Sequence, residues 1–152
     1  MPVGARFWAV IITGAMLCAS AYGQVAVRTE RELFAAVNQS RRAQGLAGLR
    51  WDESLAAAAR RHAALMAEHG STQHAFEGEP SLSARVKQAG AHFNWLSENV
   101  TQGPTAEFIH SQFIHSPSHR ANLLDRDMDS IGVGVVERGG QLFAVEDFSQ
   151  AR

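Results

Sequence analysis

Histidine is the residue type in this 152-residue sequence that most invites a search for chemistry, because seven are present beside a single cysteine. His74 follows small and polar residues in a stretch with the composition of a loop. His119 comes soon after Pro117, at a predicted helix start, and Glu98 lies in an irregular polar stretch. Two imidazoles and one carboxylate from three separated segments would suit a divalent cation, zinc first of all, with coordination positions left open. The same trio would also serve in proton transfer, so spacing alone leaves both interpretations open.

The other histidines fit structural roles better. His62 lies on the apolar stripe of a predicted helix, where we expect a core histidine with a hydrogen-bond partner rather than a ligand. His69 is near the end of that helix, a position that favours a positive charge. His115 and His119 are four residues apart, but Pro117 between them argues against a continuous helix.

A catalytic nucleophile is not evident. The sequence contains no G-x-S-x-G, H-E-x-x-H, P-loop or G-x-G-x-x-G motif. Ser116 and Ser118 near His119 are explained equally well as helix caps. The one cysteine, Cys18, excludes an intrachain disulfide, a C-x-x-C zinc site and an iron–sulfur cluster held by several cysteines.

The composition is that of one globular domain. Hydrophobic residues make up 45% and charged residues 19% of the chain, which argues against an extended disordered protein or a coiled coil. Fourteen basic and fifteen acidic residues give a formal net charge of −1. We therefore expect no nucleic-acid partner.

The first 23 residues have the features of a secretory signal peptide. Arg6 precedes the apolar run Phe7–Ala19, and the small residues Ala21 and Gly23 suit signal peptidase. We expect cleavage after Gly23, which leaves residues 24–152 as one domain in a secreted, periplasmic or cell-envelope location. A retained N-terminal anchor is the alternative, although the run is short for a membrane span and nothing later is long enough.

Helical patterns dominate the first part of the remaining chain. A capping box at Thr29-x-x-Glu32 predicts a helix start, and Gly45 predicts its end. The strongest helix is predicted between the N-cap Asp52 and Gly70. Shorter helices are predicted over 81–89, 106–115 and 119–124, and the stretch 91–105 is expected to be irregular.

The last part of the chain changes to a period of two. The stretches 131–136 and 142–148 alternate around the turn Arg138-Gly139-Gly140, which predicts an antiparallel hairpin. Gly132 and Gly134 leave one strand face bare, and we expect a closely packed helix there rather than a ligand. Helices first and strands last predict an α+β fold, with helices covering a small antiparallel sheet.

Read together, these segments resemble a bacterial CAP-superfamily (SCP) domain, the group of cysteine-rich secretory, antigen 5 and pathogenesis-related proteins. The resemblance extends over about residues 30–149, and its most specific parts are a Glu-Asn and a Ser-Pro-x-His-Arg-x-Asn segment in this order. The segments that carry it are Val37-Asn38-Gln39-Ser40-Arg41 with Gly45-Leu46, Leu49-Arg50-Trp51-Asp52-Glu53-Ser54-Leu55, Ala58-Ala59 with His62 and Met66, His74, Arg85 with Gly90, Ser97-Glu98-Asn99-Val100, Ser116-Pro117-Ser118-His119-Arg120-Ala121-Asn122-Leu123-Leu124, Ile131-Gly132-Val133-Gly134-Val135 and Ala144-Val145-Glu146-Asp147-Phe148.

The resemblance implies an α-β-α sandwich, a secreted location and a central cleft lined by two histidines and acidic residues. In some members that cleft holds a divalent cation. Matched segment by segment, His74 and His119 would be the histidines and Glu98 the acid, and these three form the expected metal site.

The chain departs from the family pattern at two places. Many members have a tryptophan and, one turn later, a second cleft glutamate, where this chain has Phe113 and Ser116. Glu146 stands where many relatives have glutamine on the last strand. A carboxylate there needs a partner or water, so we predict that Glu146 borders the cleft and partly replaces the missing acid.

The resemblance does not imply one activity, because its members have been linked to lipid binding, proteolysis and partner interaction. Our first expectation is a secreted binding module that holds a divalent cation beside a cleft for a small, lipidic or peptide ligand. One alternative is a metal-assisted hydrolase in which Glu98 or Glu146 is the catalytic carboxylate that handles protons. Another is an envelope interaction protein in which the two histidines serve only the fold.

Overall fold

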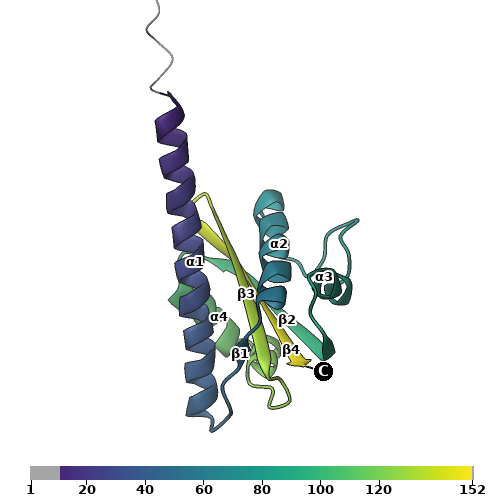
Figure 1. The fold of residues 1–152 in the computed structure, drawn as a ribbon. Helices are drawn as coiled ribbons and strands as arrows, with labels where there is room; N and C mark the ends of the chain where they lie inside the picture. Colours follow the sequence, from purple (N-terminus) through teal and green to yellow (C-terminus); the bar gives the residue numbers. More distant parts are fainter. Residues whose placement is uncertain (1–10, 152) are drawn as a thin grey trace, which may run out of the picture.

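The fold was analysed in a computed structural model that describes the backbone of residues 11–151 and the side chains from Gly23 onward. It contains five helices and four strands within that range (Figure 1). In chain order they are α1 (Ile11–Ala43), β1 (Arg50–Trp51), α2 (Glu53–His69), α3 (Leu82–Gln88), β2 (Phe93–Gly103), α4 (Ala106–His115), α5 (Pro117–Leu123), β3 (Ser130–Arg138) and β4 (Gln141–Ala151).

The strands form one sheet in the order β1-β3-β4-β2. The predicted hairpin is confirmed as β3 and β4, which are antiparallel and joined by Gly139 and Gly140, both with positive φ. β2 pairs antiparallel with the other side of β4. The sheet is not purely antiparallel as expected, because Arg50 and Trp51 add a short parallel strand beside β3.

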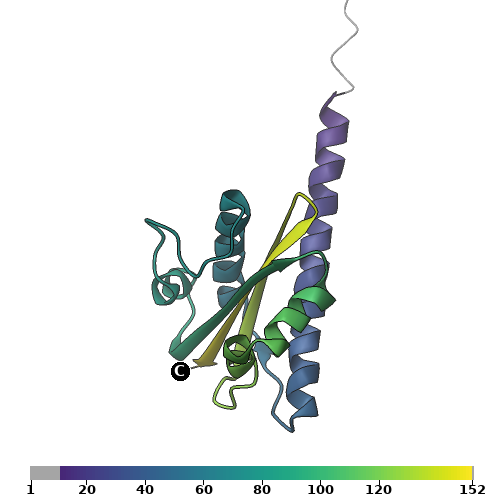
Figure 2. The ribbon, with the colours of Figure 1, turned by 180° about the vertical axis from the view of Figure 1, so that it is seen from behind.

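Helices cover both faces of this sheet, so the α+β fold and its α-β-α layering are confirmed. Successive strand residues point to opposite faces. Val100, Phe143 and Val145 pack with α2, while Val133 and Phe148 pack with α1, α4 and α5. Figures 1 and 2 show the two layers from opposite sides, with α1 projecting well beyond the end of the sheet.

Two glycines allow α2 to lie directly on β3. A Cβ atom added at Gly132 would overlap the backbone nitrogen of Ala56, and one at Gly134 would overlap that of Arg60. The bare strand face is therefore filled by a helix, as predicted. The close approach fixes the height of α2 above the sheet, and the loop that carries His74 continues from the end of this helix.

The ends of α2 follow the sequence signals. The Asp52 side chain accepts a hydrogen bond from the backbone N–H of Leu55 at 3.0 Å, and Gly70 ends the helix in the left-handed conformation with φ 63°. Since both signals are local, they operate before tertiary contacts form. The predicted helices that follow are also present, as α3, α4 and α5.

The irregular stretch expected over 91–105 is instead mainly strand β2. A simple alternation of apolar and polar residues is absent, because its buried positions include Glu98 and Asn99 as well as Val100. Polar partners from other segments replace the apolar contacts that normally identify a strand face. The sequence pattern therefore missed β2, because some of the buried side chains of this strand are polar or charged.

The helix start predicted at Thr29 is wrong, because α1 begins at Ile11 and passes through this position. Thr29 and Glu30 are buried in the middle of the helix, and Glu32 pairs with Arg28 rather than capping a helix end. The predicted signal peptide begins with residues 1–10, which lie outside the described residues, so cleavage after Gly23 stays a prediction. Within residues 11–151, no helix combines the length and apolar character needed to cross a membrane.

Candidate functional site

His74 lies in the segment between α2 and α3, residues 71–81, which we call the His74 loop. Its side chain is 62% exposed, and its Nδ1 atom is 2.9 Å from the Oε1 atom of Glu98 on β2. This contact joins two of the three residues predicted for the site. The hydrogen bond to Glu98 is the main reason that the pKa of His74 is raised above its ordinary value, and burial opposes it.

Glu98 is almost fully buried, and both of its carboxylate oxygens are engaged. Oε1 pairs with His74, and Oε2 accepts a hydrogen bond from the Arg85 guanidinium at 2.5 Å. Arg85, from α3, is itself buried and also donates to the carbonyl oxygens of His74 and Pro80. One guanidinium thus holds both the carboxylate and the main chain of the loop that bears its imidazole partner.

His119 lies on α5, where its ring packs edge-on against Phe113 with centroids 5.2 Å apart. Its Nδ1 atom is buried without a hydrogen-bond partner. Burial is the main cause that lowers the pKa of His119, and the positive charge of a protonated His74 lowers it further. The two histidines are therefore near enough to interact electrostatically, and both effects favour the neutral form of His119.

Two asparagines connect the segments that carry the site. The Asn99 side chain donates to the carbonyl oxygen of His119 at 3.1 Å. The Asn122 side chain donates to Asn99 Oδ1 at 2.9 Å and to the carbonyl oxygen of Glu98 at 3.3 Å. β2 is an edge strand of the sheet, and the two amides join it to α5. These hydrogen bonds fix the position of His119 relative to Glu98.

The side chain of Glu146 on β4 is fully buried, and it lies on the sheet face that α1, α4 and α5 cover. Asn99 donates to its Oε2 atom at 3.4 Å, while Oε1 has no partner. Burial raises the pKa of Glu146 to about 8, so the group is largely neutral at pH 7. The predicted role as a replacement for the missing acid stays untested, and its link to the histidines runs through Asn99.

Asp147, next in sequence, is a buried acid that the sequence did not single out. It lies directly across from Glu98 in the β2–β4 register, so the two side chains share a sheet face. Both of its carboxyl oxygens lack a hydrogen-bond donor. Burial and the negative charge of Glu98 raise the pKa of Asp147 well above its ordinary value, and a protonated Asp147 would donate to Glu98.

The three predicted ligands do not form a ready three-ligand cation site. Among the residues that the structure describes, no group of three or more His, Cys, Asp or Glu side chains is arranged to hold a metal ion. At this site, both carboxylate oxygens of Glu98 already have partners, His74 and Arg85. Arg85 appeared in the sequence only as a landmark of the resemblance, and no local signal indicated that it pairs with Glu98.

The model of the cysteine-rich secretory protein (CAP) family matches residues 34–148, which include His74, Glu98 and His119. The chain belongs to the CAP family. Bacillus subtilis (strain 168) YkwD is 31% identical over 111 residues, which are 72% of this chain and 43% of YkwD. This CAP domain therefore spans less than half the length of that relative.

Two solved structures share the fold. An extracellular SCP-domain protein from Bacillus anthracis superimposes with a TM-score of 0.79 at 23% identity, over 85% of this chain and 42% of that one. An outer surface protein from Borrelia burgdorferi gives 0.75 at 21% identity, over 82% and 94% of the two chains. At these identities the comparison establishes the CAP fold of this chain.

Proposed function

We propose that this CAP domain acts outside the cytoplasm, secreted or attached to the cell envelope, and binds a divalent cation through the imidazoles of His74 and His119. Zinc is the first candidate, because two neutral imidazoles suit it and open positions remain for water or a ligand. The observation that carries the proposal is the 2.9 Å contact between His74 Nδ1 and Glu98 Oε1. A carboxylate in that position orients the ring and leaves Nε2 for a cation.

The residues fit a two-histidine site with Glu98 behind it better than a three-ligand site. Burial lowers the pKa of His119 and so favours its neutral form, which is the form of imidazole that binds a metal. His74 must lose a proton first, since Glu98 raises its pKa. A bound cation would polarise an oxygen atom of a ligand, whereas Glu98 would hold the His74 ring in place.

The extracellular location is supported by two observations. Residues 1–23 have the features of a signal peptide. The names of the two structural neighbours describe an extracellular protein and an outer surface protein. N-terminal sequencing of protein recovered from the envelope or medium of an expressing bacterium should begin at Gln24. An N-terminus at Met1 would instead favour the retained anchor.

A metal-assisted hydrolase has less support. Such an enzyme needs a carboxylate that exchanges protons with a water molecule. Both Glu98 oxygens are engaged, and Glu146 is sealed in the core. Turnover of a peptide or ester that disappears in a folded Glu98→Gln variant would reverse this preference.

Isothermal titration with zinc at pH 7.5 tests the proposal. The parent protein should bind one ion, and His74→Ala and His119→Ala should each weaken binding strongly. His92→Ala, which changes an exposed histidine outside the site, is the matched control. Identical heats for the parent and the double variant His74→Ala/His119→Ala would contradict the proposal.

Glu98→Gln separates the two possible roles of the carboxylate. If Glu98 only orients His74, the variant should still bind zinc, with an affinity lower by about 10- to 100-fold. If Glu98 is a ligand, binding should fall as far as it does in His74→Ala. Native mass spectrometry of the purified protein would report the cation together with any small, lipidic or peptide ligand that co-purifies.

A further inference from the structure

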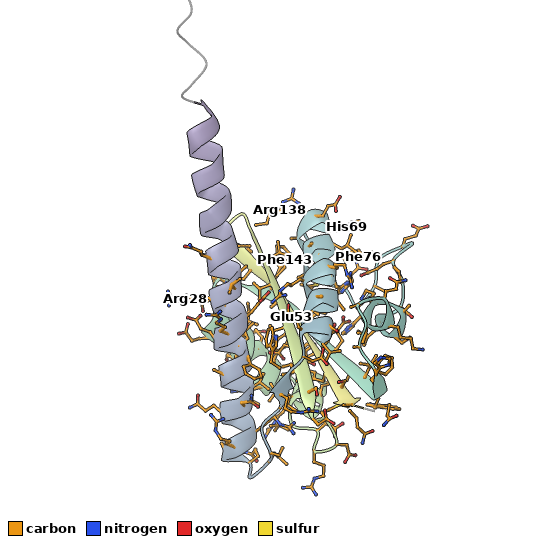
Figure 3. All side chains as sticks on the ribbon, viewed as in Figure 1. Arg28, Glu53, His69, Phe76, Arg138 and Phe143 are labelled. Atoms are coloured by element: carbon orange, nitrogen blue, oxygen red, sulfur yellow. The ribbon has the colours of Figure 1, made fainter. Side chains whose placement is uncertain are left out.

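The His74 loop has an apolar anchor in Phe76, which packs against the buried cluster that α2 forms with the sheet. Phe76 is its main apolar side chain, and its ring stacks on His69 at the end of α2, with centroids 4.3 Å apart. Figure 3 labels both residues at the same end of α2. Most of the remaining loop residues are exposed. Besides this apolar packing, hydrogen bonds from His62 and Arg85 hold the loop that carries His74.

His62 makes two hydrogen bonds from the interior of the protein. The side chain is fully buried on α2; Nδ1 is 2.7 Å from Glu79 Oε1, and Nε2 is 2.7 Å from the carbonyl oxygen of Gln73. Both partners belong to the His74 loop, and Gln73 directly precedes His74. The expectation of a core histidine with a hydrogen-bond partner is confirmed, but its partners are the two ends of a functional loop.

The chemistry of these partners fixes the protonation state of the ring. A carbonyl oxygen can only accept a hydrogen bond, and so can a carboxylate. The second oxygen of Glu79 accepts a hydrogen bond from the backbone N–H of Phe76 at 3.0 Å. A neutral imidazole has one N–H and could satisfy only one of the two acceptors. With Glu79 as a carboxylate, both acceptors are satisfied only when both nitrogens of His62 carry protons.

The charges around His62 are balanced by this assignment. Glu79 lies between His62 and Arg85, whose guanidinium is 3.4 Å from the same Oε1 atom, and Arg85 in turn pairs with Glu98. This row of buried side chains then contains two cations, His62 and Arg85, and two anions, Glu79 and Glu98. Burial raises the pKa of Asp147, which faces Glu98 from β4, well above its ordinary value. Glu98 has a second partner in the partly exposed His74 imidazole, whereas Glu79 is paired with His62 at 2.7 Å and with Arg85 at 3.4 Å.

We infer that His62, as a buried imidazolium, is a positioning residue that ties both ends of the His74 loop to α2 and so places the His74 imidazole against Glu98. No ligand contact is assigned to His62 itself. The inference deepens the proposed cation-binding function and rests on it only where the affinity for a cation is concerned. The protonation state and the fastening of the loop are tested separately.

The first test needs no substitution. A long-range ¹H–¹⁵N spectrum of the uniformly labelled protein at pH 7 without metal should show both nitrogens of His62 at the shifts of a protonated ring. His92, which is exposed, serves as the reference for an ordinary histidine under the same conditions. A single neutral tautomer at His62 would overturn the inference, whatever the protein binds.

The second test compares His62→Gln with His92→Gln. The glutamine amide cannot donate in both directions, so one end of the loop should come free. Hydrogen exchange at the amides of Phe76 and Glu79, which are hydrogen-bonded within the loop, should accelerate by about tenfold or more in His62→Gln and not in His92→Gln. Unchanged exchange would overturn the inference.

Zinc titration of the same two variants connects the loop to the site. His62→Gln should bind zinc about 10- to 100-fold more weakly than the parent, whereas His92→Gln should match it. A released loop with unchanged zinc affinity would show that His62 does not position the site. If the parent binds no zinc, the proposed function fails, while the spectrum and the exchange rates still decide the role of His62 in the loop.

Discussion

Replacing Glu146 with glutamine should stabilise the protein, and the gain should grow with pH. Glu146 is fully buried, and burial raises its pKa from an ordinary 4.5 to about 8. Its contribution to stability is complete below pH 4.5, where both the folded and the unfolded chain hold the proton. As the pH rises from 4.5 to 8, the unfolded chain releases that proton while the folded chain retains it, so stability falls.

The size of the effect follows from the difference in pKa. One pKa unit corresponds to about 1.4 kcal/mol, so the penalty that Glu146 imposes grows by about 4 kcal/mol between pH 4.5 and pH 8.5. Glutamine has nearly the same shape and can still accept the hydrogen bond from Asn99, but it does not titrate. At pH 8.5 the Glu146→Gln variant should therefore be more stable than the parent by several kcal/mol, and at pH 4.5 the two should be similar.

Urea unfolding at pH 4.5, 6.5 and 8.5 would measure this difference. With a slope of about 2 kcal/mol per molar urea, a gain of about 4 kcal/mol moves the midpoint by about 2 M. Other groups that titrate, such as Asp147, are common to both proteins and cancel in the comparison. Glu77→Gln, the same change at an exposed site, should shift no midpoint. Parallel stability curves for parent and Glu146→Gln from pH 4.5 to 8.5 would refute the reasoning.

Three further predictions concern packing and the cation. Gly134→Ala should lower the free energy of unfolding by more than about 2 kcal/mol, because its methyl group would meet the backbone of α2; Gly103→Ala, whose methyl group meets a partly exposed phenylalanine ring, should cost less in the same urea assay. Arg41→Lys should cost about 3 kcal/mol, because the buried Arg41 guanidinium donates to four carbonyl oxygens that an ammonium cannot all reach, while Arg42→Lys on the surface should be neutral. Zinc affinity should rise with pH, by up to about tenfold per unit, until His74 is deprotonated, since the carboxylate beside it raises its pKa and zinc must displace the proton. A pH-independent affinity between pH 5.5 and 8 would contradict this last prediction.

The elements with local signals were predictable from the sequence. Asp52 and Gly70 bound α2 where the N-cap and the left-handed glycine end require it. Gly139 and Gly140 form the turn of the β3–β4 hairpin. In these cases the deciding interactions lie within a few residues of one another, so the sequence alone contains them.

β2 and the beginning of α1 were not predictable in the same way. β2 buries Glu98 and Asn99, whose partners come from the separate elements α3 and α5. Thr29 has the sequence of a capping box, but it lies inside a helix that continues to Ile11. A local pattern fails where a buried polar side chain is satisfied by a distant segment, or where a longer helix overrides a possible cap.

At the candidate site, the available side chains can be read from the sequence: His74, Glu98 and His119, in segments whose order matches the CAP family. The partners of these side chains become visible in the fold alone. Glu98 pairs with Arg85 as well as with His74. The buried His62 is hydrogen-bonded to the carbonyl oxygen of Gln73 in the His74 loop. The physical reason is that the charge and the partners of a polar group depend on its burial and on segments far away in the chain, and neither is encoded in its neighbours in sequence.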